Sequence, residues 1–187
     1  MRRAATAVAG MAFLALAAGG ASAAEPFPVA IGADFTLIDH HGAARSSSEF
    51  RGRLTLVYFG YTSCPHSCGM ALNAISAALD ELGSAAERVV PLFVTVDPEY
   101  DSPKRLAAHL RNFHPAIVGL TGSASDVAAV RDSFRAAAQR VAEPGAFARL
   151  VDHTTFIYLM GPDGEPLSFL PAMLPPARIA GIVRDHY

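Results

Sequence analysis

The chain is 187 residues long, and its 15 basic and 17 acidic side chains give it a net charge of −2. Hydrophobic residues make up 51% and charged residues 17%, a balance that excludes an intrinsically disordered chain and a broad basic surface for nucleic acid. Its 2 cysteines are too few for a multi-disulfide scaffold or a four-cysteine zinc site. The sequence therefore predicts one compact domain with a single pair of cysteines.

The N-terminal segment 1–24 has the composition of a secretory signal peptide. Arg2 and Arg3 precede an uncharged stretch rich in Ala and Leu, and Ala21-Ser22-Ala23 fits a small-residue cleavage site. The stretch is also long enough for an uncleaved membrane anchor, although its many Ala and Gly residues favour cleavage. Either way, we expect residues 25–187 to form a domain in the periplasm, where a disulfide can persist.

The rest of the chain alternates between short apolar strands and amphipathic helices. The predicted elements are a hairpin over 34–42, a strand over 54–60, a helix over 70–82, a strand over 89–96, a helix from Ser102-Pro103, a strand over 117–120, a helix over 123–139, a strand over 154–160, a turn over 161–164, a strand over 166–170 and a helix from Pro175-Pro176 towards Arg184. This order predicts an α/β domain with a thioredoxin-like fold, in which a central mixed sheet is flanked by helices and extended by an N-terminal β-hairpin.

The two cysteines lie between a predicted strand and a predicted helix, where open α/β sheets place their sites. If Cys64 and Cys68 share a helical turn, their sulfurs lie on one face, close enough for a disulfide or for one metal ion. Two thiolates suit Cu(I), with imidazole as an acceptable third ligand. The spacing excludes the C-x-x-C-H attachment of c-type haem and is one residue longer than the thioredoxin redox pair. A structural disulfide stays open as an alternative.

Each of the 7 histidines is a candidate third ligand. His153 differs from the rest because it precedes the strand over 154–160, in the loop that packs beside the cysteine-bearing helix of thioredoxin-like folds. We expect it to reach both sulfurs, and Asp152 is either a partner that orients the imidazole or a surface charge. His66 lies between the cysteines, but its side chain should diverge from their shared face. The histidines expected to be solvated or locally bonded are His40, His41, His109, His114 and His186.

Four further side chains near the cysteines have local interpretations. Asp97 follows a buried strand and is expected near the cysteine loop without being a ligand, whereas Asp101 is expected to serve the end of that strand and the start of the next helix, whose N-cap is Ser102. Tyr61 is expected to shield the site or to pack, and Met70 to pack in the core.

Three motifs resemble the SCO/SenC family of copper chaperones. They are YFGYTSCPHSC, FVTVDPEYDSP and DHTTFIYLMGPDG, preceded by FTLIDHHG and FRGR, and together they cover the chain from about residue 30 to its end. Three positions depart from the family pattern, which has Asp and Val where His66 and Ser67 stand and Pro where Gly69 stands. These departures bear on the affinity and redox potential of the site and on its client.

The resemblance implies that Cys64, Cys68 and His153 bind one copper ion per chain, as Cu(I) or Cu(II). It implies a chaperone rather than an enzyme, which delivers copper to the dinuclear copper centre of a haem–copper oxidase. The expected partners are cytochrome oxidase subunit II or a related client and another periplasmic copper carrier or thiol reductant, close to the membrane and without nucleic acid.

The alternative is a thiol–disulfide oxidoreductase that reduces client cysteines with Cys64 and Cys68, for which His153 is dispensable. A peroxidase-like reading of Thr62 and Cys64 is disfavoured, because their spacing is one residue short of the usual peroxidatic motif.

Overall fold

A computed structural model describes residues 30–141 and 149–187 of the chain. The leader predicted over 1–24 lies outside the described residues and stays a prediction. Within the described ranges, no helix combines the length and the apolar character needed to cross a membrane.

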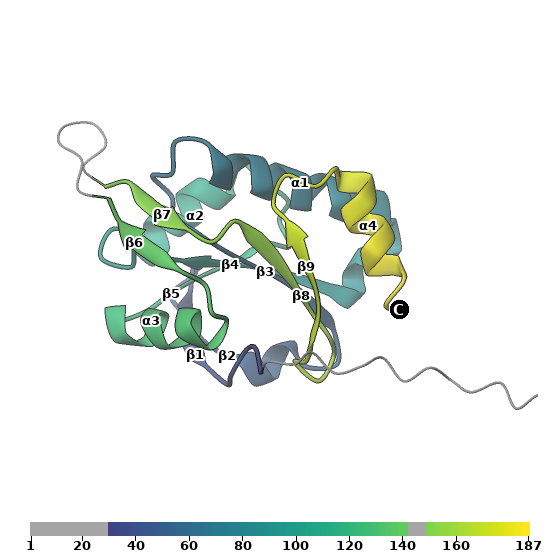
Figure 1. Ribbon diagram of the computed structural model, residues 1–187, viewed down its shortest axis with the longest axis horizontal. Helices are drawn as coiled ribbons and strands as arrows, with labels where there is room; N and C mark the ends of the chain where they lie inside the picture. Colours follow the sequence, from purple (N-terminus) through teal and green to yellow (C-terminus); the bar gives the residue numbers. More distant parts are fainter. Residues whose placement is uncertain (1–29, 142–148) are drawn as a thin grey trace, which may run out of the picture.

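A seven-stranded mixed sheet forms the centre of the domain (Figure 1). Its order is β2-β1-β5-β4-β3-β8-β9, with β3–β4 and β4–β5 parallel and the other pairs antiparallel. A separate antiparallel pair joins β6 to β7. The strands are β1 (Thr36–Asp39), β2 (Ala44–Ser46), β3 (Leu54–Gly60), β4 (Val89–Thr95), β5 (Val118–Thr121), β6 (Ala138–Arg140), β7 (Val151–His153), β8 (Phe156–Met160) and β9 (Pro166–Pro171).

Helices cover both faces of this sheet. Side chains of α1 (Ser67–Leu82), α2 (Pro103–Leu110) and α4 (Pro176–Arg184) join one buried cluster, and those of α3 (Ala124–Ser133) join the other. Two short 3-10 helices, η1 (Ser47–Phe50) and η2 (Gly83–Arg88), complete the connections. The predicted thioredoxin-like architecture is therefore confirmed, and the predicted hairpin is β1–β2, which extends the main sheet through β5.

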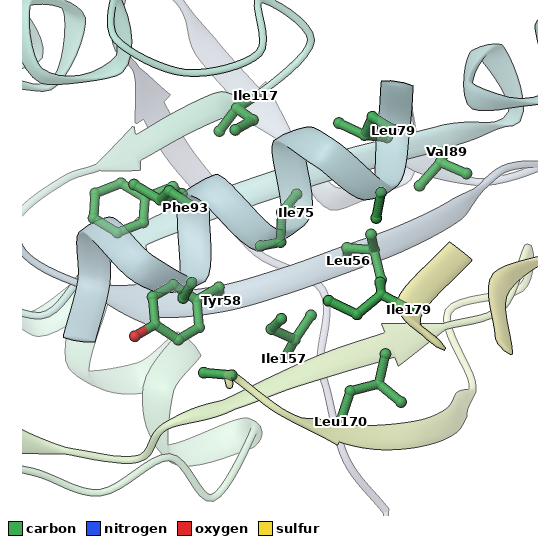
Figure 2. Close-up of a cluster of buried hydrophobic side chains, with 14 of the residues drawn as sticks. Leu56, Tyr58, Ile75, Leu79, Val89, Phe93, Ile117, Ile157, Leu170 and Ile179 are labelled. Carbon is green, nitrogen blue, oxygen red and sulfur yellow. The ribbon is translucent and has the colours of Figure 1, made fainter. Parts of the chain in front are cut away.

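Strand β3 is the centre of the core because every one of its residues is buried. Leu56 and Tyr58 belong to the cluster that includes Ile75 of α1, whereas Val57 and Phe59 belong to the cluster on the opposite face. Figure 2 shows the first cluster, with side chains of the sheet meeting those of α1 and α4. Full burial of one such apolar side chain contributes about 1.5–3 kcal/mol. The end of β3 is thereby fixed where the cysteine loop begins.

The helix predicted over 123–139 is wrong in its last third. Helix α3 ends at Ser133, and Arg135 adopts a left-handed conformation with φ of 51°. Residues 138–140 then form β6, in which Ala138 pairs with His153 of β7. The prediction followed the helical spacing of apolar residues that continues to Ala138, but tertiary pairing with β7 overrides that local pattern.

The last residue of β3, Gly60, allows a close approach of three elements. A Cβ built on Gly60 would lie 2.6 Å from Phe93 Cε2 on β4 and 3.0 Å from Cys68 Sγ on α1. Real Cβ atoms do not come as close as the shorter of these contacts, so the packing at this point requires a residue without a side chain.

We predict that Gly60→Ala lowers the free energy of unfolding of the copper-free protein by about 1–3 kcal/mol, because the ring of Phe93 and the Cys68 sulfur must move. Chemical denaturation of the reduced protein measures this. The matched control is Gly69→Ala, since a Cβ on Gly69 meets nothing within 4 Å and alanine favours the helix. Equal stability of the Gly60 variant and the wild type would contradict the prediction.

Candidate metal centre

The loop after β3 places the two cysteines at the start of α1. Cys64 lies in the loop, where its N–H donates to the Tyr61 carbonyl at 3.2 Å, and Cys68 lies in the first turn of the helix. The backbone N–H of Cys68 donates to Cys64 Sγ at 3.4 Å, and the Ser67 hydroxyl lies 3.4 Å from the same sulfur. Both cysteines are free thiols, Cys64 half-buried and Cys68 fully buried. The sulfurs therefore lie together, although α1 begins only at Ser67.

Strand β7 brings His153 to these sulfurs from a distant part of the sequence. Its Nε2 atom lies 3.5 Å from Cys68 Sγ. The ligand atoms of Cys64, Cys68 and His153 all lie within 4.8 Å of one another. Across the described ranges, this is the one group of three or more His, Cys, Asp or Glu side chains close enough to hold a metal ion. The three site residues predicted from the sequence thus meet at one point.

The orientation of the His153 ring is set by a backbone carbonyl. Its Nδ1 lies 2.9 Å from the Thr154 oxygen, which can only accept, so Nδ1 carries the proton of the neutral ring. The lone pair of Nε2 then faces the sulfurs, as a metal ligand requires. Asp152, for which the sequence left open an orienting partner or a surface charge, is exposed, because successive residues of β7 point to opposite sides.

Two buried tyrosines enclose the imidazole. The rings of Tyr58 and Tyr61 meet the His153 ring edge-on, with centroids 6.2 and 5.7 Å away. The Tyr61 hydroxyl also accepts a hydrogen bond from the Val151 N–H at 3.2 Å, which ties β7 to the end of β3. Tyr61 therefore packs against the site and also holds the strand that carries the third ligand.

Asp101 holds the beginning of the cysteine loop. Its buried carboxylate accepts hydrogen bonds from the Thr62 N–H at 2.9 Å and the Thr95 hydroxyl at 2.7 Å, and also from the Thr62 hydroxyl. The cap of the next helix is Ser102, whose hydroxyl accepts from the Arg105 N–H, as the Ser102-Pro103 pair predicts. Asp101 thus joins the loop before Cys64 to the end of β4.

Asp97 holds the β6–β7 side of the site. Its carboxylate is buried and receives two nitrogens of Arg149, at 2.8–3.2 Å, and one nitrogen of Arg140, at 3.0 Å. Arg140 is on β6, and Arg149 lies just before β7. Asp97 is not one of the three grouped side chains. It fixes both strands of the hairpin that carries His153.

The two thiols differ in acidity. Hydrogen bonding with Cys68 lowers the pKa of Cys64 well below its usual value, and the Ser67 hydroxyl adds to this effect. The same interaction, together with burial, raises the pKa of Cys68. The thiolate is both the nucleophile and the metal ligand. The lowered pKa favours the thiolate form at Cys64, the more accessible sulfur, and the raised pKa favours the thiol form at Cys68.

The site opens to solvent through a shallow pocket of about 190 Å³, lined by Cys64, His66 and His153 among other residues. His66 precedes the first turn of α1 and makes no capping hydrogen bond with its side chain. Met70 is 45% exposed, so the expectation that it packs in the core is wrong. The described histidines that lie outside the ligand group are His40, His41, His66, His109, His114 and His186.

Sequence reasoning missed how the three ligands are held in place. Arg149 and Tyr61 act through strand β7, whose pairing with β6 was not predicted. The one available signal was the pair of arginines, Arg140 and Arg149, on either side of the segment 141–148.

We predict that Asp101→Ala lowers the free energy of unfolding by about 2–4 kcal/mol, since it leaves buried donors of Thr62 and Thr95 without an acceptor. Denaturation of the reduced protein measures this loss. Asp152→Ala is the matched control and should unfold like the wild type, because Asp152 is exposed. A stable Asp101 variant would mean that the loop is held by other contacts.

Comparison with known proteins places this site in a family. The SCO1/SenC family model matches residues 23–187. Protein sco1 of Schizosaccharomyces pombe is 41% identical over 138 residues, which cover 72% of this chain and 52% of that protein. The structure of Bradyrhizobium japonicum ScoI with copper bound has 35% identity and a TM-score of 0.79, and the match covers 84% of this chain and 100% of that one.

A more distant structure shows the same fold. BsSco, described as having a disulfide switch and as a member of the Sco family of cytochrome c oxidase assembly proteins, is 24% identical with a TM-score of 0.66, and the match covers 85% of this chain and 95% of that one. The chain spans about half the length of its fission yeast relative. The extent of the family match confirms the resemblance seen in the motifs: the chain belongs to the SCO1/SenC family.

Proposed function

We propose that the chain is a copper chaperone of the periplasm that holds one copper ion through Cys64, Cys68 and His153. The observation that carries this proposal is the meeting of three donor atoms within 4.8 Å, although His153 is 85 residues from Cys68. A chain gains such a group only if several distant contacts hold it together. The copper-bound structure of a relative at 35% identity supports the choice of metal.

The donor set suits both oxidation states of copper. Thiolates are soft ligands that favour Cu(I), and imidazole is a common ligand of copper. Two sulfurs can hold Cu(I) by themselves, whereas Cu(II) gains more from the nitrogen of His153. The half-exposed Cys64 gives a ligand of the partner protein access to the metal, so copper can leave by exchange of ligands.

The proposed client is the dinuclear copper centre in subunit II of a haem–copper oxidase, or a related centre. This rests on membership of the family and on the description of BsSco as one of the cytochrome c oxidase assembly proteins. The leader predicted over 1–24 would bring the domain to the side of the membrane where such centres lie.

A second candidate function is reduction of the client's cysteines. The asymmetry of the two thiols favours it, because an accessible thiolate at Cys64 attacks a disulfide and the neighbouring Cys68 then releases the mixed disulfide. Two electrons pass from the pair to the client disulfide, which leaves a Cys64–Cys68 disulfide and two client thiols. A disulfide switch in BsSco is consistent with this chemistry.

We predict that the reduced protein binds one copper per chain and that its Cu(II) form has a thiolate charge-transfer band. Cys64→Ser or Cys68→Ser should remove most of this band. His153→Ala should weaken binding of Cu(II) by at least tenfold more than binding of Cu(I), because the sulfurs remain. Metal analysis, visible spectroscopy and competition with chelators measure these effects. His41→Ala, at an exposed histidine of the β1–β2 turn, is the control and should behave as the wild type.

Two outcomes would overturn the copper proposal. One is stoichiometric copper on protein whose cysteines are oxidised to a disulfide. The other is unchanged Cu(II) binding in the His153 variant. If no copper binds but Cys64 and Cys68 reduce a client disulfide, the second function stands. Transfer itself is measured by mixing the loaded protein with the copper-free soluble domain of a subunit II and following the spectrum of the dinuclear centre.

A further inference from the structure

The hydroxyl of Tyr58 is a buried polar group that the fold leaves without a partner. The residue is 0% exposed, and its Oη atom has no hydrogen-bond partner. Within the described residues, the other buried side-chain atoms in this condition are His109 Nε2 and Arg131 Nε. His109 lies between aromatic rings, and Arg131 bonds through its other nitrogens. Tyr58 is the one of the three that adjoins the thiols, so its hydroxyl calls for an explanation.

The position of Tyr58 brings its hydroxyl to the sulfurs. A Cβ placed on Gly60 would lie 3.2 Å from Tyr58 Cε1 and 3.0 Å from Cys68 Sγ, so ring edge and sulfur flank the same point. Figure 2 shows the oxygen directed away from Leu56 and Ile157, towards the end of α1 at which Cys68 lies. Burial raises the pKa of the Tyr58 hydroxyl, and the neighbouring Cys68 and Cys64 add to this rise.

The chemistry of sulfur gives this hydroxyl an acceptor once a metal binds. A protonated thiol is a poor acceptor, whereas a thiolate accepts strongly. A cysteine that ligates a metal does so as a thiolate, so the Cys68 sulfur is a strong acceptor when copper is bound. The Tyr58 hydroxyl, which has no hydrogen-bond partner in the copper-free protein, then has one within reach. Hydrogen bonds to a ligating sulfur are known to tune copper centres, because they reduce the electron density that the sulfur donates.

We propose that Tyr58 is a positioning residue of the copper centre, whose hydroxyl donates a hydrogen bond to the Cys68 sulfur once copper binds there and so favours Cu(I) over Cu(II). This inference rests on the proposed copper function. Cu(II) depends more than Cu(I) on charge donated by the thiolate, so the bond weakens Cu(II) binding more. Tyr58 thus acts on the metal through Cys68 without touching it.

The test is Tyr58→Phe in the full chain, which removes the hydroxyl and keeps the ring. In the copper-free protein the variant should be as stable as the wild type or more so, because the lost group was unpaired. With Cu(II) bound, the thiolate charge-transfer band should move to longer wavelength. The ratio of Cu(II) to Cu(I) affinity should rise roughly tenfold, the factor expected for one charge-assisted hydrogen bond.

Tyr158→Phe is the matched control, since Tyr158 is a buried tyrosine of the neighbouring strand β8 whose side chain joins the cluster on the opposite face of the sheet. Its spectrum and affinity ratio should equal those of the wild type. The inference is overturned if the Tyr58 variant matches this control in both, or if it is less stable than the wild type without copper. If the wild type itself binds no copper, the proposed function fails first, and the two failures are thereby distinguished.

Discussion

The architecture of the site depends on the burial of β3 on both faces. Because the strand has no exposed side, neither its register nor its end can shift without moving two hydrophobic clusters. Its last residue, Gly60, has no side chain, so α1 approaches closely enough for Cys68 to lie against the strand. The thiols therefore have a rigid base although Cys64 itself belongs to a loop.

The third ligand is held in a different way. His153 belongs to a short two-stranded sheet outside the main one, and this pair has little apolar surface of its own. Polar contacts hold it instead: the carboxylate of Asp97 binds arginines from both sides of the hairpin, and the Tyr61 hydroxyl holds Val151. Buried carboxylates that bind arginine in this way depend on geometry, since each partner left alone would be a desolvated charge. Hydrophobic packing therefore supports the two cysteines, whereas ion pairs and hydrogen bonds support His153.

Sequence patterns predicted well the hydrophobic elements that carry the two cysteines. Continuous apolar runs identify β3 and β4, and the helical spacing of Leu72, Ile75 and Leu79 identifies α1, because burial imposes a period on the sequence. The motifs around Cys64, Cys68 and His153 also indicated the ligand set. The polar contacts that hold His153 could not be derived in this way, since ion pairs and hydrogen bonds to carbonyl groups produce no periodic pattern in the sequence. For the same reason the contact between His153 and the Thr154 carbonyl was not predicted, and β6 was interpreted as the end of a helix.

The residues at the rim of the site can be substituted more freely than those at its base. His66 and Met70 point to solvent, and the backbone at Gly69 borders open space. Substitutions at these positions alter what an approaching protein meets without repacking the interior. A library of variants confined to them is therefore a practical way to retune partner choice, because each member inherits the same folded scaffold and the same three ligands.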